Sequence, residues 1–252
     1  MQILTQSQET LLKDERKILN DLRLALVQFG ATPEDVDTLG HSIQQLDELF
    51  LLVVVGEFNA GKSAFINALL GQRLLTEGVT PTTAQINVLK YGNSQGRTVI
   101  NDHQHIITLP ADLLAEISIV DTPGTNAIIR QHEIITAQFV PQADLVLFVT
   151  SADRPFTESE RQFLAQIRDW GKKVVLVVNK SDILQTDTDR QEVSRYVSEN
   201  GHMLLSTSPD VFLVSARNAL LAKQGQPQLW QESGFEALET YIHERLDEKG
   251  RL

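Results

Sequence analysis

Apolar residues recur at helical spacing over the first fifty residues of the chain. Between residues 5 and 29 they lie three, four or seven positions apart and form one stripe, through Leu11, Ile18, Leu22, Ala25 and Phe29. Gly30 is typical of the position just after a helix. Thr32, followed by a proline and two acidic residues, is typical of a helix start. The pattern predicts two helices before residue 50.

Continuous apolar runs replace this stripe from residue 50 onward. Such runs are typical of strands that are buried on both faces of a sheet. They cover Phe50–Val55, Ile117–Val120, Leu145–Val149, Val174–Val178 and Val211–Val214. Segments with helical spacing lie between them, at Ser63–Leu70, Ile129–Phe139, Glu158–Trp170 and Arg190–Asn200. Strands that alternate with helices predict an α/β fold with a doubly wound, mostly parallel sheet.

Residues 84–109 show a different pattern, with short extended stretches between Gly, Asn and Asp turns. The stretches are Gln85–Tyr91, Arg97–Asn101 and Ile106–Leu109. They predict an antiparallel meander at one edge of the sheet. Further on, Thr157 and Glu160 have the spacing of a capping box that opens a helix.

The pattern divides the chain into three parts. Residues 1–49 are the N-terminal helices, and residues 50–222 form the α/β domain. In the last part, residues 223–252, a polar loop over 223–234 precedes a helix from Phe235 to about Glu248. We expect this helix to pack on the α/β domain or on the N-terminal helices.

Composition narrows the function classes. The chain has 252 residues, of which 42% are hydrophobic and 22% charged, as in ordinary globular proteins. It has no cysteine, which excludes disulfides, thiolate metal sites and cysteine nucleophiles. The net charge of −11 argues against a nucleic-acid partner, because phosphate contacts need a basic face. No signal peptide and no apolar run of about 20 residues is present, so we expect a cytoplasmic location.

A phosphate-binding loop follows the first buried run. Residues 56–63 match GxxxxGK[ST] between a predicted strand and a predicted helix, which is the context that this motif requires. The glycines let successive N–H groups turn toward phosphate oxygens, Lys62 adds a charge at the β- and γ-phosphates, and the Ser63 hydroxyl binds Mg²⁺. The residues expected at the phosphates are Glu57, Phe58, Asn59, Ala60, Gly61, Lys62, Ser63 and Ala64.

A DxxG motif follows the run Ile117–Val120. There Asp121 can hold Mg²⁺ through water, and the Gly124 N–H can meet a γ-phosphate. A second DxxG, at residues 37–40, lies in a predicted helix upstream of the phosphate loop and is therefore set aside.

Two further motifs indicate guanine. Asp182 can accept hydrogen bonds from N1–H and N2–H₂ of guanine, a pair of donors that adenine lacks, so a buried Asp182 excludes ATP. Asn179 can bridge loops and the base, and the stem of Lys180 can lie over the ring. The Ala216 N–H can reach the guanine carbonyl; the residues expected in that loop are Ser215, Ala216 and Arg217. Each motif follows a strand, where doubly wound sheets bind ligands.

The order GxxxxGKS, DxxG, NKxD and SA resembles that of the TRAFAC-type GTPases. The stretches GEFNAGKSAFINALLG, TPTTA, DTPGTNAIIRQHE and ADLVLFVTSADRPFTESE, within residues 50–220, resemble bacterial dynamin-like proteins and mitofusin-type GTPases. The resemblance implies a GTPase domain over residues 50–222 that binds GTP, GDP and Mg²⁺ and converts GTP to GDP and phosphate. It also implies helices at both ends like those next to a dynamin stalk, self-association through the G domain, and membrane remodelling.

The long stalk and the membrane-touching tip of dynamins are not in this sequence. We therefore expect a truncated chain whose full-length form contacts a membrane peripherally, through regions absent from this chain.

The residues that organise hydrolysis are less clear from the motifs. Thr125 occupies the position where Ras-type GTPases carry a glutamine. The loop GxxNxGKS resembles that of GTPases in which the asparagine helps to bind K⁺, so Asn59 is a candidate K⁺ ligand, or else only a turn cap. By resemblance to mitofusin-like dynamins, Thr83, with Thr82 second, supplies the switch hydroxyl on Mg²⁺. The expected catalytic residues are Lys62, Thr83, Thr82 and Asn59, and the expected metal ligands are Ser63, Thr83 and Asp121.

Two alternative functions stay open at this point. An Era- or MnmE-like GTPase that acts in ribosome or tRNA biology shares the asparagine and the paired threonines, although such proteins carry a nucleic-acid-binding module. A slow switch that holds GTP and recruits a partner would need little turnover.

Overall fold

The computed structural model describes residues 6–32, 35–36, 39, 49–76, 85–123 and 135–249. By their contacts, the residues form two compact units. One contains residues 51–242, and the other contains residues 1–50 and 243–252. The three-part division of the sequence stays a prediction.

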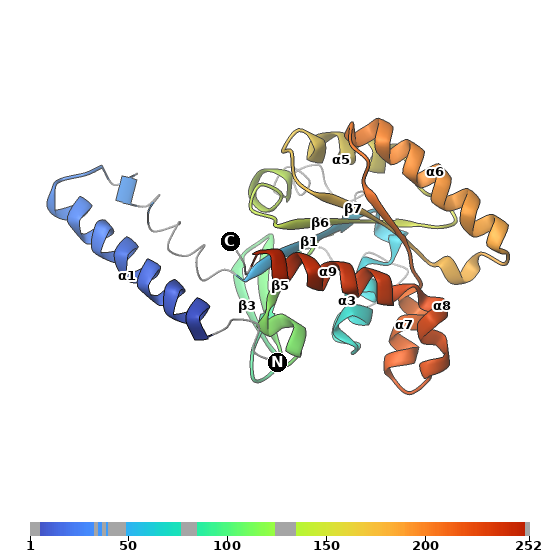
Figure 1. Cartoon of the computed structure of the whole chain (residues 1–252), viewed down its shortest axis with the longest axis horizontal. Helices are drawn as coiled ribbons and strands as arrows, with labels where there is room; N and C mark the ends of the chain where they lie inside the picture. Colours follow the sequence, from blue (N-terminus) through green and yellow to red (C-terminus); the bar gives the residue numbers. More distant parts are fainter. Residues whose placement is uncertain are drawn as a thin grey trace. The chain divides into compact units, whose positions relative to one another are not determined.

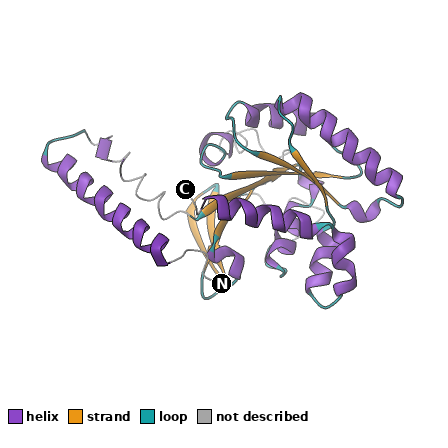
Figure 2. Ribbon diagram, in the orientation of Figure 1, coloured by secondary structure: helices purple, strands orange, loops and turns teal. Residues whose placement is uncertain are grey.

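An eight-stranded sheet forms the centre of the larger unit (Figures 1 and 2). Its strands are β1 (Phe50–Gly56), β2 (Ile86–Tyr91), β3 (Gly96–Asn101), β4 (Gln104–Leu109), β5 (Ile117–Asp121), β6 (Leu145–Ser151), β7 (Val174–Asn179) and β8 (Asp210–Leu213). Their order is β3-β4-β2-β5-β1-β6-β7-β8. The pairs β1–β6, β6–β7 and β7–β8 are parallel, and β2–β5 is antiparallel. The predicted mostly parallel α/β sheet is therefore confirmed.

The edge strands β2, β3 and β4 lie where the sequence predicted them, but their order corrects the predicted meander. A meander would place β3 between β2 and β4, whereas β4 pairs in parallel with β2 and antiparallel with the outermost strand, β3. Burial explains the order. His105 and Leu109 of β4 are buried, whereas β3 has no buried residue. The more apolar strand therefore occupies the covered position.

Helices cover both faces of this sheet. They are α3 (Lys62–Leu70), α5 (Glu158–Arg168), α6 (Asp187–Leu205), α7 (Ala216–Lys223), α8 (Trp230–Ser233) and the first part of α9 (Phe235–Lys249). The other unit contains α1 (Gln6–Gln28). Figure 2 shows α5 and α6 on one side of the sheet and α3 and α7 on the other. On the first side, Phe163 of α5 packs 6.5 Å from Phe148 of β6, centroid to centroid. On the second, Phe65 of α3 packs 5.5 Å from Phe235 of α9.

Local signals in the sequence set several helix boundaries. Gly30 has a φ of 74°, and the Ala31 N–H donates to the Leu26 carbonyl at 3.0 Å, which is a Schellman ending for α1. The capping box of Thr157 and Glu160 is present at the start of α5. A second capping box, which the sequence reading missed, starts α6 at Thr186, so this helix is longer than predicted.

Other predicted elements differ from the structure or lie outside the described residues. Residues 227–233, predicted as loop, contain a 3₁₀ turn and the short α8, because Pro227 suits a first helical turn and Gly234 ends α8 with a φ of 67°. Of the predicted helix at 129–139, only 135–139 is described, as one turn of π-helix. Most of the second N-terminal helix also lies outside the described residues.

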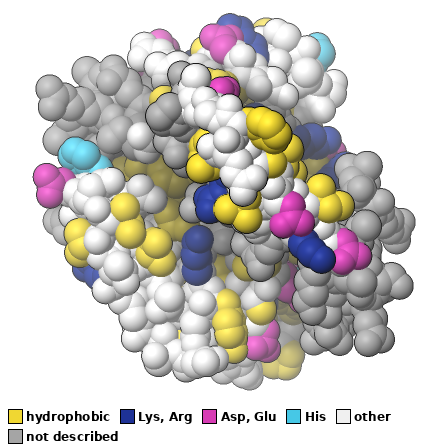
Figure 3. All heavy atoms as spheres, turned by 90° about the vertical axis from the view of Figure 1, so that its left-hand side faces the viewer, with side chains coloured by type: hydrophobic (Ala, Val, Ile, Leu, Met, Phe, Trp, Pro, Cys, Tyr) yellow, Lys and Arg dark blue, Asp and Glu magenta, His cyan; other side chains and the backbone are white. Residues whose placement is uncertain are grey.

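The surface shows exposed apolar side chains between polar and charged ones, as one face in Figure 3 illustrates. On α1 they include Ile18 and Leu22, so part of the predicted stripe is open to solvent. Within the described residues, no helix has the length and apolar character that crossing a membrane requires.

We expect Phe235→Ala to lower the free energy of unfolding by about 3–5 kcal/mol, because it leaves a cavity beside Phe65. Phe235 is 0% exposed, whereas Phe29 is 89% exposed, so Phe29→Ala is the matched control and should change stability by less than about 0.5 kcal/mol. Urea denaturation followed by circular dichroism measures both. Equal effects of the two changes would contradict the packing of α9 against α3.

Candidate functional site

The phosphate loop begins where β1 ends. Gly56 has a φ of 145°, and a Cβ there would lie 1.9 Å from the Val149 carbonyl oxygen. Gly61 has a φ of 83°, and a Cβ there would lie 2.6 Å from the Asn179 side-chain nitrogen. Both positions therefore require glycine, because β6 and β7 approach the loop so closely. Between them, residues 58–60 form a 3₁₀ turn in which Asn59 is exposed.

Lys62 lies inside this loop, at the first position of α3. Its ammonium donates hydrogen bonds to the carbonyl oxygens of Gly56, at 3.0 Å, and Glu57, at 3.1 Å. Burial lowers the pKa of Lys62 to about 8, and the nearby carboxylate of Asp121 opposes that effect. The loop thus holds a largely desolvated cation that can exchange its carbonyl partners for phosphate oxygens.

Asp121 is the last residue of β5 and is buried. Within the described part of the chain, neither carboxylate oxygen has a hydrogen-bond partner. Burial raises the pKa of Asp121 to about 6, although Lys62 and the approach of Asn87 and Ser63 lower it in part. A buried carboxylate with unsatisfied oxygens beside a serine hydroxyl fits Mg²⁺, which prefers oxygen ligands. Asp121 and Ser63 are therefore the residues that would hold this ion.

Thr122, the next residue, fixes the start of the DxxG segment. Its buried hydroxyl donates to the Val54 carbonyl of β1 at 2.9 Å. This bond joins the metal side of the site to the strand that leads into the phosphate loop. The sequence reading missed Thr122, although its place one residue after a buried strand is a usable signal.

Asn179, the last residue of β7, joins the phosphate loop to the loop that follows β8. Its amide nitrogen donates to the Ala60 carbonyl at 2.9 Å and lies 3.4 Å from the Gly61 carbonyl oxygen. Its amide oxygen accepts from the Ala216 N–H at 3.1 Å. One buried side chain thus brings together segments that lie more than a hundred residues apart in sequence.

Asp182 lies in a short 3₁₀ turn after β7, where it is exposed and not buried as the sequence predicted, because only Ser181 of this turn packs inward. Its position is fixed from the β8 side. The Ser215 hydroxyl donates to the Asp182 carboxylate at 2.6 Å and accepts from the Asn218 N–H at 3.1 Å, which caps α7. Ala216 is buried behind this contact, and Arg217 is exposed. The structure therefore gathers Asp182, Ser215 and Ala216 at one end of the sheet.

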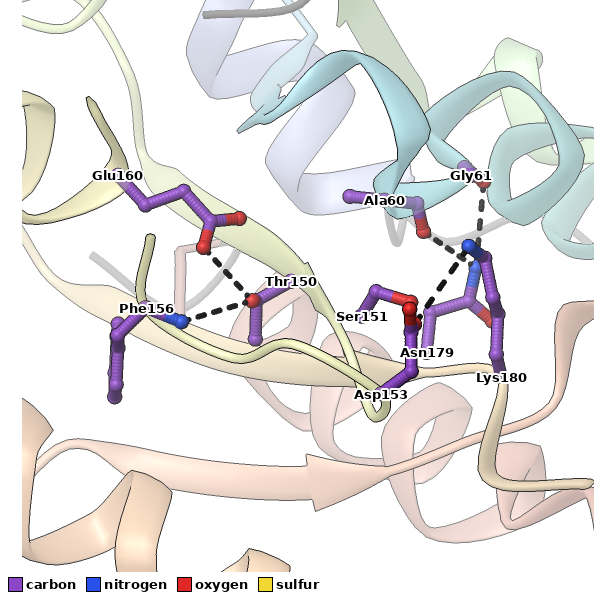
Figure 4. Close-up of polar contacts among 9 residues, drawn as sticks. All are labelled: Ala60, Gly61, Thr150, Ser151, Asp153, Phe156, Glu160, Asn179 and Lys180. Carbon is purple, nitrogen blue, oxygen red and sulfur yellow. Dashed lines mark hydrogen bonds and ion pairs between the residues drawn. The ribbon is translucent and has the colours of Figure 1, made fainter. Parts of the chain in front are cut away.

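Lys180 follows Asn179 with a φ of 64°, in the left-handed region. Its ammonium lies 3.9 Å from the carboxylate of Asp153, in the loop between β6 and α5 (Figure 4). The Ser151 hydroxyl also donates to Asp153, and this bond holds the pKa of Asp153 below its usual value. Asp153 is a further site residue that the motifs did not indicate, although it lies just past the end of a parallel strand.

The start of α5 also contacts the phosphate loop. Glu160 is buried and accepts from the Thr150 hydroxyl at 3.1 Å (Figure 4). It also accepts from the Thr157 N–H at 3.0 Å. Burial raises the pKa of Glu160. Beside it, the Ser159 hydroxyl donates to the carboxylate of Glu57 at 3.4 Å. The first turn of α5 therefore contacts the start of the phosphate loop through Ser159.

Three predicted site residues, Thr82, Thr83 and Gly124, lie outside the described residues, as does Thr125. The structure thus brings together the phosphate loop, Asp121 and the two guanine motifs at the carboxyl ends of β1, β5, β7 and β8.

We expect Asp121→Asn to stabilise the ligand-free protein above pH 6. The folded carboxyl holds its proton more tightly than the unfolded one, with a pKa of about 6 against 3.8, so wild-type stability falls as pH rises between these values. The neutral amide of the variant does not lose stability in this way. In the wild type the loss reaches about 3 kcal/mol, because one pKa unit corresponds to about 1.4 kcal/mol. Urea denaturation at pH 4 and pH 7.5, without Mg²⁺, measures the difference.

Asp102→Asn, at an exposed turn, is the control and should follow the wild type at both pH values. If the free energy of unfolding of Asp121→Asn differed from that of the wild type by the same amount at both pH values, burial of the Asp121 charge would not explain the difference.

Comparison with known proteins relates this geometry to a family. The family model described as 50S ribosome-binding GTPase matches residues 51–180. A probable transmembrane FZO-like GTPase of Arabidopsis thaliana chloroplasts is 40% identical over 97% of this chain and 29% of its own length. A bacterial dynamin-like protein of Nostoc punctiforme is 30% identical over 59% of this chain and 27% of its own length. The chain therefore spans less than a third of these two relatives.

A solved structure of an oligomerised bacterial dynamin pair has the same fold. It superposes with a TM-score of 0.70 over 96% of this chain and 44% of that one, at 22% identity. The family model covers about half of the chain and includes the phosphate loop, Asp121 and Asn179. The chain therefore belongs to this GTPase family, as the G domain of a dynamin-like, FZO-type GTPase.

Proposed function

We propose that this G domain binds GTP with Mg²⁺ at the carboxyl ends of β1, β5, β7 and β8, and hydrolyses it to GDP and phosphate. The observation that carries the proposal is the double contact of Asn179, whose side chain holds the Ala60 carbonyl and the Ala216 N–H together. A phosphate loop and a guanine loop that are joined by one side chain suit a single nucleotide that spans both.

The phosphate half of the site has a distinct task for each residue. Lys62 neutralises the β- and γ-phosphates, and the N–H groups of residues 57–64 face their oxygens. Asp121 and Ser63 would hold Mg²⁺, which would supply positive charge at the phosphates when it is bound. Because Lys62 and Asp121 are buried, their charges act in a medium that screens them less than water does.

The guanine half selects the base through Asp182. The hydroxyl of Ser215 fixes one carboxylate oxygen at 2.6 Å, so the other is free to face N1–H and N2–H₂ of guanine. Adenine lacks these donors and would leave the carboxylate unpaired. Lys180 covers the ring with its stem while its ammonium is directed toward Asp153.

Hydrolysis needs positive charge on the developing leaving oxygen. We propose two sources, a K⁺ ion held with the help of Asn59 and a second G domain that packs over the nucleotide. Asn59 is exposed at the loop, as such a role requires. Thr83, with Thr82 second, supplies the switch hydroxyl, by the resemblance of TPTTA to the mitofusin-type sequence.

We propose self-association and membrane remodelling only for the longer protein. A relative of known structure is an oligomerised dynamin pair described in terms of long-range membrane sensing and tethering. We propose that this chain self-associates through its G domain and that regions outside this chain place the full-length protein peripherally at a membrane.

We expect Asp182→Asn to weaken GTP binding by about a hundredfold or more and to create affinity for xanthosine triphosphate. The amide can pair with the second ring carbonyl of xanthine, whereas it lacks the charge that guanine needs. Fluorescent-nucleotide titration measures both, and Asp187→Asn, at the exposed start of α6, is the matched control. Unchanged GTP affinity of Asp182→Asn would remove Asp182 from the proposal.

We expect Asp153→Asn to weaken GDP binding by at most about fivefold, because an exposed ion pair is worth about 0.2–1 kcal/mol. The change frees the ammonium of Lys180 and so loosens the stem over the base. In a Lys180→Ala background, Asp153→Asn should have no further effect on the Kd. An equal loss in both backgrounds would show that Asp153 does not act through Lys180.

We expect GTP turnover per molecule to rise with protein concentration and to be several-fold faster in K⁺ than in Na⁺. Burial in a dimer would exclude water from the cation and strengthen its field. Asn59→Ala should flatten the K⁺ response and leave GDP binding nearly intact, while Asn93→Ala, at an exposed turn, should change neither. A rate that depends on neither concentration nor cation would instead favour a slow, partner-recruiting switch.

A further inference from the structure

Asn87 of β2 lies directly opposite Asp121 in the antiparallel pair of β2 and β5. In such a pair, opposed side chains point to the same face of the sheet, with their Cβ atoms about 4.5–5.5 Å apart. Leu89 and Ile119 form the next pair on this face, and both are fully buried, whereas Asn87 is half-buried. The register therefore places the Asn87 amide beside the carboxylate on the metal side of the site.

An asparagine is an unusual residue at this position of the sheet. Asparagine is depleted in strands, where β-branched side chains pack better. The neighbouring positions of β2 follow this preference, since Ile86, Val88 and Leu89 are all apolar and buried. A valine or an isoleucine at position 87 would suit the strand equally well. Sheet packing alone therefore does not account for the amide, which indicates a polar partner.

The other strand neighbour of Asn87 leaves its amide N–H groups to Asp121. That neighbour is His105 of β4, which is buried. The Arg97 Nε–H donates to Nδ1 of His105 at 3.2 Å, so Nδ1 is the acceptor and Nε2 carries the ring proton. Nε2–H can donate to the Asn87 carbonyl oxygen, but it cannot accept from the amide N–H groups. Of these two register partners, only Asp121 can accept from them.

The carboxylate of Asp121 lacks the donor that Asn87 can supply. In the part of the chain that the structure describes, neither of its oxygens has a hydrogen-bond partner. Burial raises the pKa of Asp121, and the nearby Lys62 ammonium and the approach of the Asn87 amide oppose that effect. Groups that hydrogen-bond to a metal ligand orient it, and their loss typically lowers metal affinity about 10–100-fold.

We propose that Asn87 is a positioning residue for the metal side of the site, whose amide donates to one oxygen of Asp121 and directs the other toward Mg²⁺ or its water. The inference rests on the proposed GTP site and adds to it a residue that none of the sequence motifs contains. Because the amide is neutral, it orients the carboxylate without cancelling the negative charge that attracts the cation.

The test measures how much Mg²⁺ the full chain needs to bind a fluorescent, non-hydrolysable GTP analogue. In the wild type, the Kd of the analogue should fall as Mg²⁺ is added, and the Mg²⁺ concentration at the midpoint of this fall is compared between variants. We expect Asn87→Leu, which has a similar shape and no donor, to raise the midpoint about tenfold or more. Its Kd in EDTA should stay within about twofold of the wild-type value, because the phosphate loop and the guanine loop are unchanged.

Three further variants separate positioning from packing. Asn87→Gln keeps the amide on a longer stem and should recover part of the loss. In an Asp121→Asn background, Asn87→Leu should not change the Mg²⁺ response further, because the carboxylate that it orients is gone. Thr98→Leu, at an exposed position of β3, is the matched control in the same sheet and should keep the wild-type midpoint.

Three results would overturn the inference. A wild-type midpoint in Asn87→Leu, or an equal shift in the Asp121→Asn background, would show that Asn87 does not act through Asp121. A loss of affinity by the same factor in EDTA and in Mg²⁺ would assign the defect to packing of the sheet. If the wild type does not bind the analogue at any Mg²⁺ concentration, the proposed function itself fails.

Discussion

The contacts of one buried amide side chain determine how this site is assembled. Asn179 bonds to Ala60 of the phosphate loop and to Ala216 of the loop after β8, and a Cβ on Gly61 would collide with it. These segments meet because β1, β6, β7 and β8 run parallel and end at the same edge. The amide has both a donor and an acceptor, so it can satisfy a carbonyl on one side and an N–H on the other. An aspartate would lose the first bond.

Around this junction the protein tolerates charges that a purely structural core would avoid. Lys62 and Asp121 are buried, and burial shifts the pKa of each toward its neutral form. Neither oxygen of Asp121 has a hydrogen-bond partner among the described residues. Such an arrangement lowers stability, and it is typical of sites whose missing partner is a ligand. Phosphate oxygens and a divalent cation are the partners that these two groups match.

The loop between β6 and α5 connects this junction to the rest of the larger unit. Asp153 reaches Lys180, and the Ala152 N–H donates to the Asn179 carbonyl at 2.9 Å. At its far end, Phe156 is buried with a φ of 59°, a strained conformation for an aromatic residue. Contacts at both ends therefore hold the loop, so that its acidic residue faces the guanine side of the site.

The sequence by itself determined what depends on neighbours in the chain. Apolar runs located the buried strands, the capping box located the start of α5, and GxxxxGKS between a strand and a helix located Lys62 and Ser63. These signals are local, because strand burial, helix caps and phosphate loops are each encoded within a few residues. The tertiary structure alone decided the order of β3 and β4, the contact of Asp153 with Lys180, and the anchoring of Thr122 to Val54. Each of these joins residues that periodicity does not relate, since burial and close approach choose between partners only after the strands have been assembled into a sheet.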